Sequence, residues 1–121
     1  MTRRSDPTPL LPLSPAVLHI LVALAKGDLH GYGISRDVEE QTDGALRLGP
    51  GTLYGSLQRM TDAGLIREVA APAKAEGSHA ERRRYYGITA LGRSALRADA
   101  ERLAAAVRLA RSRLGTRLEN A

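Results

Sequence analysis

The stretch GPGTLYGSLQRMTDAGLI at residues 49–66 decides the fold. Pro50 stands where a first-turn proline costs a helix no hydrogen bond, and Gly64 stands where a helix ends in a left-handed residue. At about 100° per residue, the large apolar side chains share one narrow face. They are Leu53, Leu57 and Met60. The pattern predicts a helix over about 51–63 that packs on one side and leaves the other free.

The free side of this helix suits the major groove of DNA. Small residues would let the backbone approach a duplex closely: Gly51, Gly55 and Ser56. Polar side chains that can bond to base edges accompany them: Thr52, Ser56, Gln58 and Arg59. The first turn also offers unpaired N–H groups to a phosphate. The alternative is the solvated face of an ordinary core helix, and the rest of the chain decides between the two.

Two shorter helices are expected upstream. Ser-Pro at 14–15 supplies the N-cap and first residue of one helix, and HGYG at 30–33 opens a second, over about 32–42. A connection at 44–49, in which a brief strand is expected, then leads into the third helix. This order is that of a helix-turn-helix. Tyr32 either places its ring in the core and its hydroxyl on a DNA phosphate, or packs half-buried on the surface.

A basic hairpin follows the third helix. Residues 65–70 and 82–88 read as strands, and 71–81 as a polar loop between them. The second strand begins with Arg82, Arg83 and Arg84. Since side chains alternate along a strand, at least one of these points outward and can contact phosphates. The hairpin is therefore predicted to be a wing; the alternative is an edge strand guarded by charge.

The last predicted helix, over about 90–118, begins at Thr89 as its N-cap. Apolar residues recur along it at helical spacing: Leu96, Leu103, Val107, Ala110, Leu114 and Leu118. A helix of about 28 residues exceeds roughly 40 Å and is too long for a small domain to cover. The sequence therefore predicts that this stripe is a homodimer interface.

The predicted elements together give a small, mainly α-helical protein with a β-hairpin wing. The expected parts of the 121-residue chain are a flexible arm at 1–13, a winged helix-turn-helix at 14–88 and a dimerisation helix at 89–121. A net charge of +5 favours double-stranded DNA as the partner. The absence of cysteine fits a cytoplasmic location. The apolar run at 16–25 is too short to cross a membrane.

Enzyme chemistry is not expected. The three histidines, His19, His30 and His79, have no metal-ligand spacing. The sequence contains no Gly-x-Ser-x-Gly motif, and GPGTLYG lacks the Lys-Ser/Thr of a phosphate-binding loop. We therefore expect no cofactor and no metal. The remaining alternative is a winged helix that contacts only other proteins, and the basic wing argues against it.

Three segments together resemble the PadR family of winged-helix transcriptional regulators. They are HGYGI at 30–34, GPGTLYGSLQRMTDAGLI at 49–66 and RRRYYGITALGRSAL at 82–96. The resemblance covers roughly 14–96 and implies a homodimeric cytoplasmic regulator, usually a repressor, whose DNA affinity falls when a small-molecule effector binds. It also places Tyr54 near the DNA backbone. The family's wing arginine and tyrosine pair correspond to Arg84, Tyr85 and Tyr86.

This sequence departs from the family pattern at three points. Gly55 stands where the family commonly has proline, so the first turn of the recognition helix is less stiff. Thr61 replaces a common acidic residue. The last helix contains no aromatic residue, so a flat aromatic effector would lack the stacking partner that drug-binding members provide.

Overall fold

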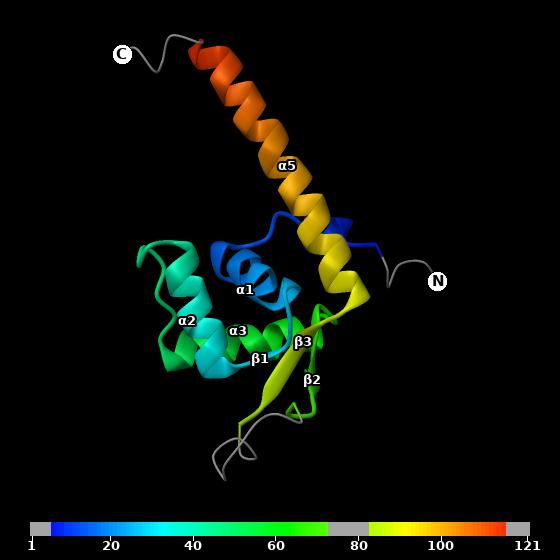
Figure 1. Ribbon diagram of the computed structural model, residues 1–121. Helices are drawn as coiled ribbons and strands as arrows, with labels where there is room; N and C mark the ends of the chain where they lie inside the picture. Colours follow the sequence, from blue (N-terminus) through cyan, green and yellow to red (C-terminus); the bar gives the residue numbers. More distant parts are fainter. Residues whose placement is uncertain (1–5, 73–82, 116–121) are drawn as a thin grey trace.

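The computed structural model describes residues 6–72 and 83–115 and has the mainly α, winged-helix architecture that the sequence predicts. Helices α1, α2 and α3 form a compact group, the sheet lies beside it, and α5 leaves this body and projects away (Figure 1). The elements are the 3-10 turn η2 (Thr8–Leu10), α1 (Pro15–Ala25), β1 (Leu29–His30), α2 (Gly31–Gln41), α3 (Pro50–Asp62), β2 (Ile66–Val69), β3 (Tyr85–Ile88) and α5 (Ala90–Leu114).

Helix α1 is at the centre of the core and contacts α2, α3, α5 and β3. Ser14 caps it as predicted: the Ser14 hydroxyl accepts the Val17 N–H at 3.2 Å, and Pro15 is the first helical residue. The core contains fully buried apolar side chains from all three short helices: Ile20, Leu21, Leu24, Ile34, Val38, Leu57 and Met60. None of the helices in the described part of the chain combines the length and apolarity that crossing a bilayer requires.

Helix α3 begins and ends one residue before the predicted bounds, and the residues predicted to start and stop it do so. Gly49 is the N-cap and Pro50 the first helical residue. Gly64 has a φ of +81°, its N–H reaches the Thr61 carbonyl at 3.0 Å, and the Leu65 N–H reaches the Met60 carbonyl at 2.9 Å. These two bonds form a Schellman ending, which turns the chain directly into β2.

The sheet has the strand order β1-β3-β2, and both pairs are antiparallel. Tyr86 is opposite both Leu29 and Glu68. The two-residue strand β1 was not predicted, because a Leu-His pair carries no alternating pattern. The brief strand predicted at 44–49 is wrong: these residues adopt no strand and are bound instead to the end of α2.

The described part of the N-terminal segment is packed and differs from the predicted flexible arm. Leu13 is only 9% exposed, and its N–H donates to the Asp99 carboxylate at 3.4 Å. Leu10 and Leu11 also pack against the core, and η2 contacts α5. Residues 6–13 therefore belong to the folded body because three leucines find an apolar surface beside α5. Residues 1–5 lie outside the described residues.

Helix α5 divides into a packed half and a projecting half. Its start follows prediction: Thr89 accepts the Gly92 N–H at 3.0 Å. Ala95 is fully buried and Leu96 packs against the core, so the winged-helix body includes the start of α5 and does not end at residue 88. Every residue from 100 to 114 is exposed. The described helix ends at Leu114, and Leu118 lies outside the described residues.

Candidate DNA-binding surface

One side of α3 faces solvent and carries most of the side chains predicted to contact DNA. Its exposed members are Gly51, Thr52, Tyr54, Gln58 and Arg59, and Gly55 is half-buried among them. In the free protein the two longest polar side chains are held by neighbours on the same helix. Gln58 donates to the Asp62 carboxylate at 3.0 Å, and the Arg59 guanidinium donates to the Ser56 hydroxyl at 3.3 Å.

Ser56 corrects the predicted set of base-reading residues. It is 1% exposed and lies on the packed side of α3 with Leu53, Leu57 and Met60. A step of three residues along a helix returns to nearly the same face, so Ser56 follows Leu53 into the core. Its hydroxyl cannot reach a base from there. Its contribution is to accept a hydrogen bond from Arg59.

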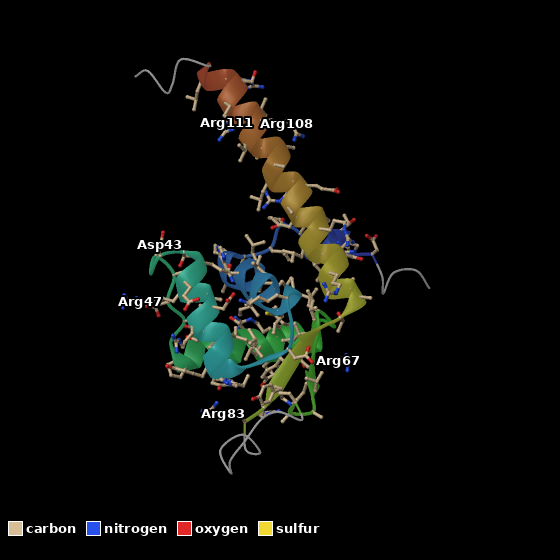
Figure 2. All side chains as sticks on the ribbon, in the orientation of Figure 1. Asp43, Arg47, Arg67, Arg83, Arg108 and Arg111 are labelled. Carbon is tan, nitrogen blue, oxygen red and sulfur yellow. The ribbon has the colours of Figure 1, made fainter. Side chains whose placement is uncertain are left out.

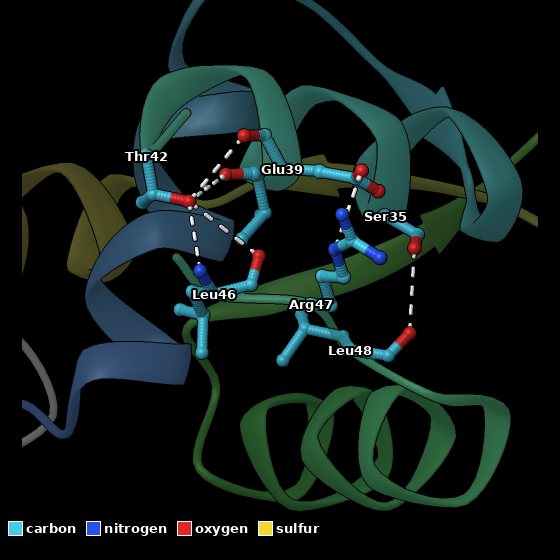
Figure 3. A network of polar contacts seen from close by, with 7 residues as sticks. Ser35, Glu39, Thr42, Leu46, Arg47 and Leu48 are labelled. Atoms are coloured by element: carbon cyan, nitrogen blue, oxygen red, sulfur yellow. Dashed lines mark hydrogen bonds and ion pairs between the residues drawn. The ribbon is translucent and has the colours of Figure 1, made fainter. Parts of the chain in front are cut away.

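A polar network holds the link between α2 and α3 (Figure 3). The Thr42 hydroxyl accepts the Leu46 N–H at 3.0 Å and donates to the Val38 carbonyl at 3.1 Å. Farther along, Arg47 forms an ion pair with Glu39 at 3.5 Å. These contacts bind the link to the end of α2 and thereby fix the angle at which α3 is presented.

The wing consists of β2, β3 and the residues between them. Its two described arginines just before β3, Arg83 and Arg84, contact different neighbours. Arg84 forms an ion pair with Glu68 of β2 at 2.8 Å, and the hydrogen bond from Arg84 lowers the pKa of the Glu68 carboxyl. Arg83 reaches His30 at the start of α2, at the lower edge of the molecule in Figure 2. Tyr85 and Tyr86 are buried in the sheet. Arg82 lies outside the described residues.

A hollow of about 380 Å³ opens where α2, α3 and the wing meet. We call it the α2–wing hollow; its described lining residues are His30, Gly31, Tyr32, Tyr54, Arg83 and Arg84. Tyr54 leans over Gly31 so closely that a Cβ at Gly31 would collide with the tyrosine hydroxyl and lie 2.9 Å from Cζ. The fold thus gathers side chains from three separate segments, and His30 among them was not predicted as a site residue.

Tyr32 does not place its ring in the core. It is 62% exposed, lies parallel to the His30 ring with centroids 6.3 Å apart, and has the Arg36 guanidinium 5.8 Å from its own ring centroid. Its hydroxyl is therefore available at the mouth of the α2–wing hollow. Sequence could have indicated His30 only through its position as the N-cap of α2, where a side-chain acceptor is needed.

The projecting half of α5 carries an apolar stripe on its own. Leu103, Val107 and Leu114 are 36%, 47% and 69% exposed, and Ala110 is exposed between them. At about 100° per residue these four positions fall within roughly 60° of one another. Leu109, which is 52% exposed, lies on a different face. Arg108 lies far from α3 (Figure 2).

The sequence profile described as "Transcriptional regulator PadR-like family" matches residues 20–98. The chain belongs to this family. PadR-like proteins are transcriptional regulators and not a class of enzymes, and the profile spans α2, α3, the wing and the packed half of α5. The family resemblance that the three sequence segments predict is confirmed.

The chain is also similar in sequence to two other proteins. A 37.1 kDa protein of a Streptomyces fradiae transposon is 40% identical over 89 residues, which are 74% of this chain and 23% of that protein. A Lysinibacillus sphaericus protein is 31% identical over 77 residues, 64% of this chain and 67% of that one. This PadR-like chain thus spans less than a quarter of the first relative's length.

Solved structures show the same fold. A PadR family regulator of Clostridium difficile superposes with a TM-score of 0.68 at 25% identity, covering 84% of this chain and all of that one. A transcriptional regulator of Clostridium thermocellum superposes with a TM-score of 0.64 at 28% identity, covering 80% of this chain and 87% of that one. PadR of Bacillus subtilis, crystallised with operator DNA, superposes with a TM-score of 0.58 at 27% identity, covering 71% of this chain and 45% of that one.

Proposed function

We propose that this PadR-like protein binds a specific DNA operator as a homodimer and represses transcription. The observation that carries the proposal is the continuity of one surface: the exposed face of α3, two tyrosines and the arginine-bearing wing lie side by side. The Bacillus subtilis PadR was crystallised with operator DNA, which supports DNA as the partner of this chain.

In this proposal the surface makes two kinds of contact with DNA, one to base edges and one to phosphates. Thr52, Gln58 and Arg59 have the donors and acceptors to read base edges, while Gly51 and Gly55 let the α3 backbone come close. Tyr32, Tyr54 and the wing arginines Arg82, Arg83 and Arg84 contact phosphates. Ser56 has no direct role in this scheme, because it is buried.

The apolar stripe of α5 would pair with the same stripe of a second copy. Leu103, Val107, Ala110 and Leu114, continued by Leu118, form the seam, and Leu96 serves the core of its own chain. An isologous pair would set two recognition helices about 34 Å apart, one DNA turn. The operator is then an inverted repeat.

Repression follows from operator occupancy, and relief of repression requires a second state. An effector that binds between the dimer helices would change the separation of the two α3 helices and lower affinity for both half-sites. Because α5 has no aromatic side chain, we expect no stacked planar effector there. The protein would act in the cytoplasm, where its DNA is.

Binding to the protein's own promoter fragment tests the proposal. Fluorescence anisotropy with this fragment and with a scrambled duplex, at several salt concentrations, should show tighter binding to the promoter and a linear fall of log affinity with log salt. Equal, weak binding to both duplexes with no salt response would contradict DNA recognition. It would favour the alternative, a winged helix that contacts only proteins.

A further inference from the structure

The two ring nitrogens of His30 make contacts that cannot both be hydrogen bonds. The Gly33 N–H donates to Nδ1 at 3.0 Å, and an Arg83 guanidinium nitrogen lies 3.1 Å from Nε2. A backbone N–H and a guanidinium can only donate. A neutral imidazole has one acceptor nitrogen and one N–H, and an imidazolium has no acceptor. One of the two contacts therefore lacks its acceptor.

The contact with Gly33 is the one that a hydrogen bond must satisfy. His30 is the N-cap of α2, and the Gly33 N–H is one of the first-turn donors that have no partner inside the helix. Arg83 is exposed and can turn its long side chain toward water. Burial, followed by the charge of Arg83, lowers the pKa of His30, so the ring is neutral near pH 7. Nδ1 accepts, and Nε2 carries the proton.

Two donors then face each other at the edge of the α2–wing hollow. The His30 Nε2–H and the Arg83 guanidinium, 3.1 Å apart, both need an acceptor. When the exposed Arg83 side chain turns aside, one oxyanion beside the two groups accepts from both. The other polar groups that line the hollow are the hydroxyls of Tyr32 and Tyr54, which can donate, and Arg84, whose guanidinium is paired with Glu68 of β2. Among the described residues that line it, none is acidic.

We propose that the α2–wing hollow binds a phosphate oxyanion and that His30 is one of its ligands, donating from Nε2 beside Arg83. The proposal deepens the DNA-binding function and rests on it for one point, that the anion is a backbone phosphate of the duplex. Free phosphate offers the same chemistry. Phosphate fits better than a carboxylate, because its tetrahedral oxygens can accept from His30, Arg83 and Tyr54 at once from different directions.

The tautomer of His30 in the full-length protein is the first test. Long-range proton–nitrogen correlation NMR should show Nδ1 as the unprotonated nitrogen and Nε2 as the protonated one at pH 7.5. A protonated Nδ1 would overturn the proposal, because Nε2 would then simply accept from Arg83. His19, whose Nδ1 faces the Gln41 side chain at 2.7 Å, supplies an internal comparison outside the hollow.

Titration separates the two sources of phosphate. If the ligand is a DNA phosphate, the His30 Nε2 resonance shifts and saturates with a duplex of any sequence and does not respond to millimolar inorganic phosphate. If it saturates with inorganic phosphate alone, the hollow is a site for a free anion. A resonance that responds to neither ligand overturns the proposal.

The variant His30→Asn isolates the donor, because asparagine is as good an N-cap as any residue and can still accept the Gly33 N–H. We expect unchanged thermal stability, about tenfold weaker binding to promoter and scrambled duplex alike, and an unchanged salt slope, because a neutral donor releases no counterion. Arg83→Ala should instead lower the slope by about one.

The outcomes also separate this proposal from the function it deepens. Wild-type affinity in His30→Asn overturns the phosphate site and leaves DNA binding standing. A wild-type protein that ignores every duplex, yet shifts His30 with inorganic phosphate, retains the site and loses the proposed function.

Discussion

The guanidinium of Arg84 and the carboxylate of Glu68 are joined by two hydrogen bonds across the wing, Nη2 to Oε1 at 2.8 Å and Nε to Oε2 at 3.2 Å. A fork of this kind directs both donors at one acceptor group. In the free protein this pair neutralises one of the wing arginines. A DNA phosphate that binds Arg84 must therefore compete with Glu68.

Replacing Glu68 with glutamine should strengthen DNA binding. The amide removes the competing charge, so we expect Glu68→Gln to bind promoter and scrambled duplexes severalfold more tightly, with a salt slope steeper by about one because Arg84 becomes a full phosphate contact. Glu101→Gln removes the same charge from an exposed position on α5 and serves as the control. An equal gain in both variants would mean that only net charge had changed.

Base reading should depend on Arg59 and not on Ser56. Arg59→Ala is expected to cost about 1–3 kcal/mol on promoter DNA and little on scrambled DNA, because a base contact is lost. Ser56→Ala should leave the preference between the two duplexes within a factor of two or so, since the hydroxyl is buried. Arg108→Ala removes one positive charge from an exposed position far from α3 (Figure 2) and serves as the control for the change in net charge. Comparable losses on both duplexes for Arg59→Ala would show that Arg59 contacts only the backbone.

The outline of α3 could be read from sequence because its determinants are local. Pro50, Gly64 and the apolar spacing act within one or two turns, and both ends of the helix are where they indicate. Ser56 could not be placed, since a small polar residue next to an apolar stripe is compatible with either side of the helix. The Thr89 cap and the wing strands were foreseeable for the same local reason. The predicted start of the second strand is wrong, because β3 begins at Tyr85 and Arg83 and Arg84 precede it.

Dimerisation should depend on one face of α5. Leu103→Asp combined with Leu114→Asp places two charges in the proposed seam and should give a monomer by light scattering at micromolar concentration. Ala105→Asp with Leu109→Asp puts the same charges on exposed positions of a different face of the same helix, and this variant should remain a dimer. A dimer that survives the first pair of changes contradicts the assigned seam.

The buried carboxylate of Asp99 should hold the N-terminal segment. It is 0% exposed and accepts from the Leu13 N–H and from Arg102, while Oδ2 has no partner among the described residues. Asp99→Ala should cost about 1–3 kcal/mol in chemical denaturation and speed amide exchange at Leu13. Exchange at the capped Gly92 N–H should stay slow, and unchanged exchange at Leu13 would show that the tether contributes nothing.

The hydrogen bond between Leu13 and Asp99 could not be predicted from the sequence. Leu13 and Asp99 are 86 residues apart, and neither has a local pattern that indicates the other. The α2–wing hollow is similar: the fold brings His30, Tyr54 and Arg83 together from three segments, and only the sheet pairing of β1 with β3 puts His30 beside the wing. Tertiary contacts of this kind depend on packing and not on propensity.

His30 should make stability depend on pH. Burial first, and Arg83 second, lower the pKa of His30 from its ordinary value of 6.5. The unfolded chain therefore takes up a proton at His30 more readily than the folded protein does. The contribution of neutral His30 to the free energy of unfolding is fully present above pH 6.5, and it is lost as pH falls through the lowered pKa of the folded state. Protonation of Nδ1 would also break the cap of α2.

Denaturation curves of wild type and His30→Asn measure this contribution directly. The groups that face the ring are Arg83 and Tyr85 of the wing side and Tyr32 of α2, and the Lys26–Asp37 ion pair lines the adjoining hollow. Those groups remain in the variant, so any titration of theirs appears in both proteins. The wild type should lose more stability than His30→Asn between pH 7.5 and pH 5. Parallel losses would mean that His30 titrates in the folded protein as it does in the unfolded chain.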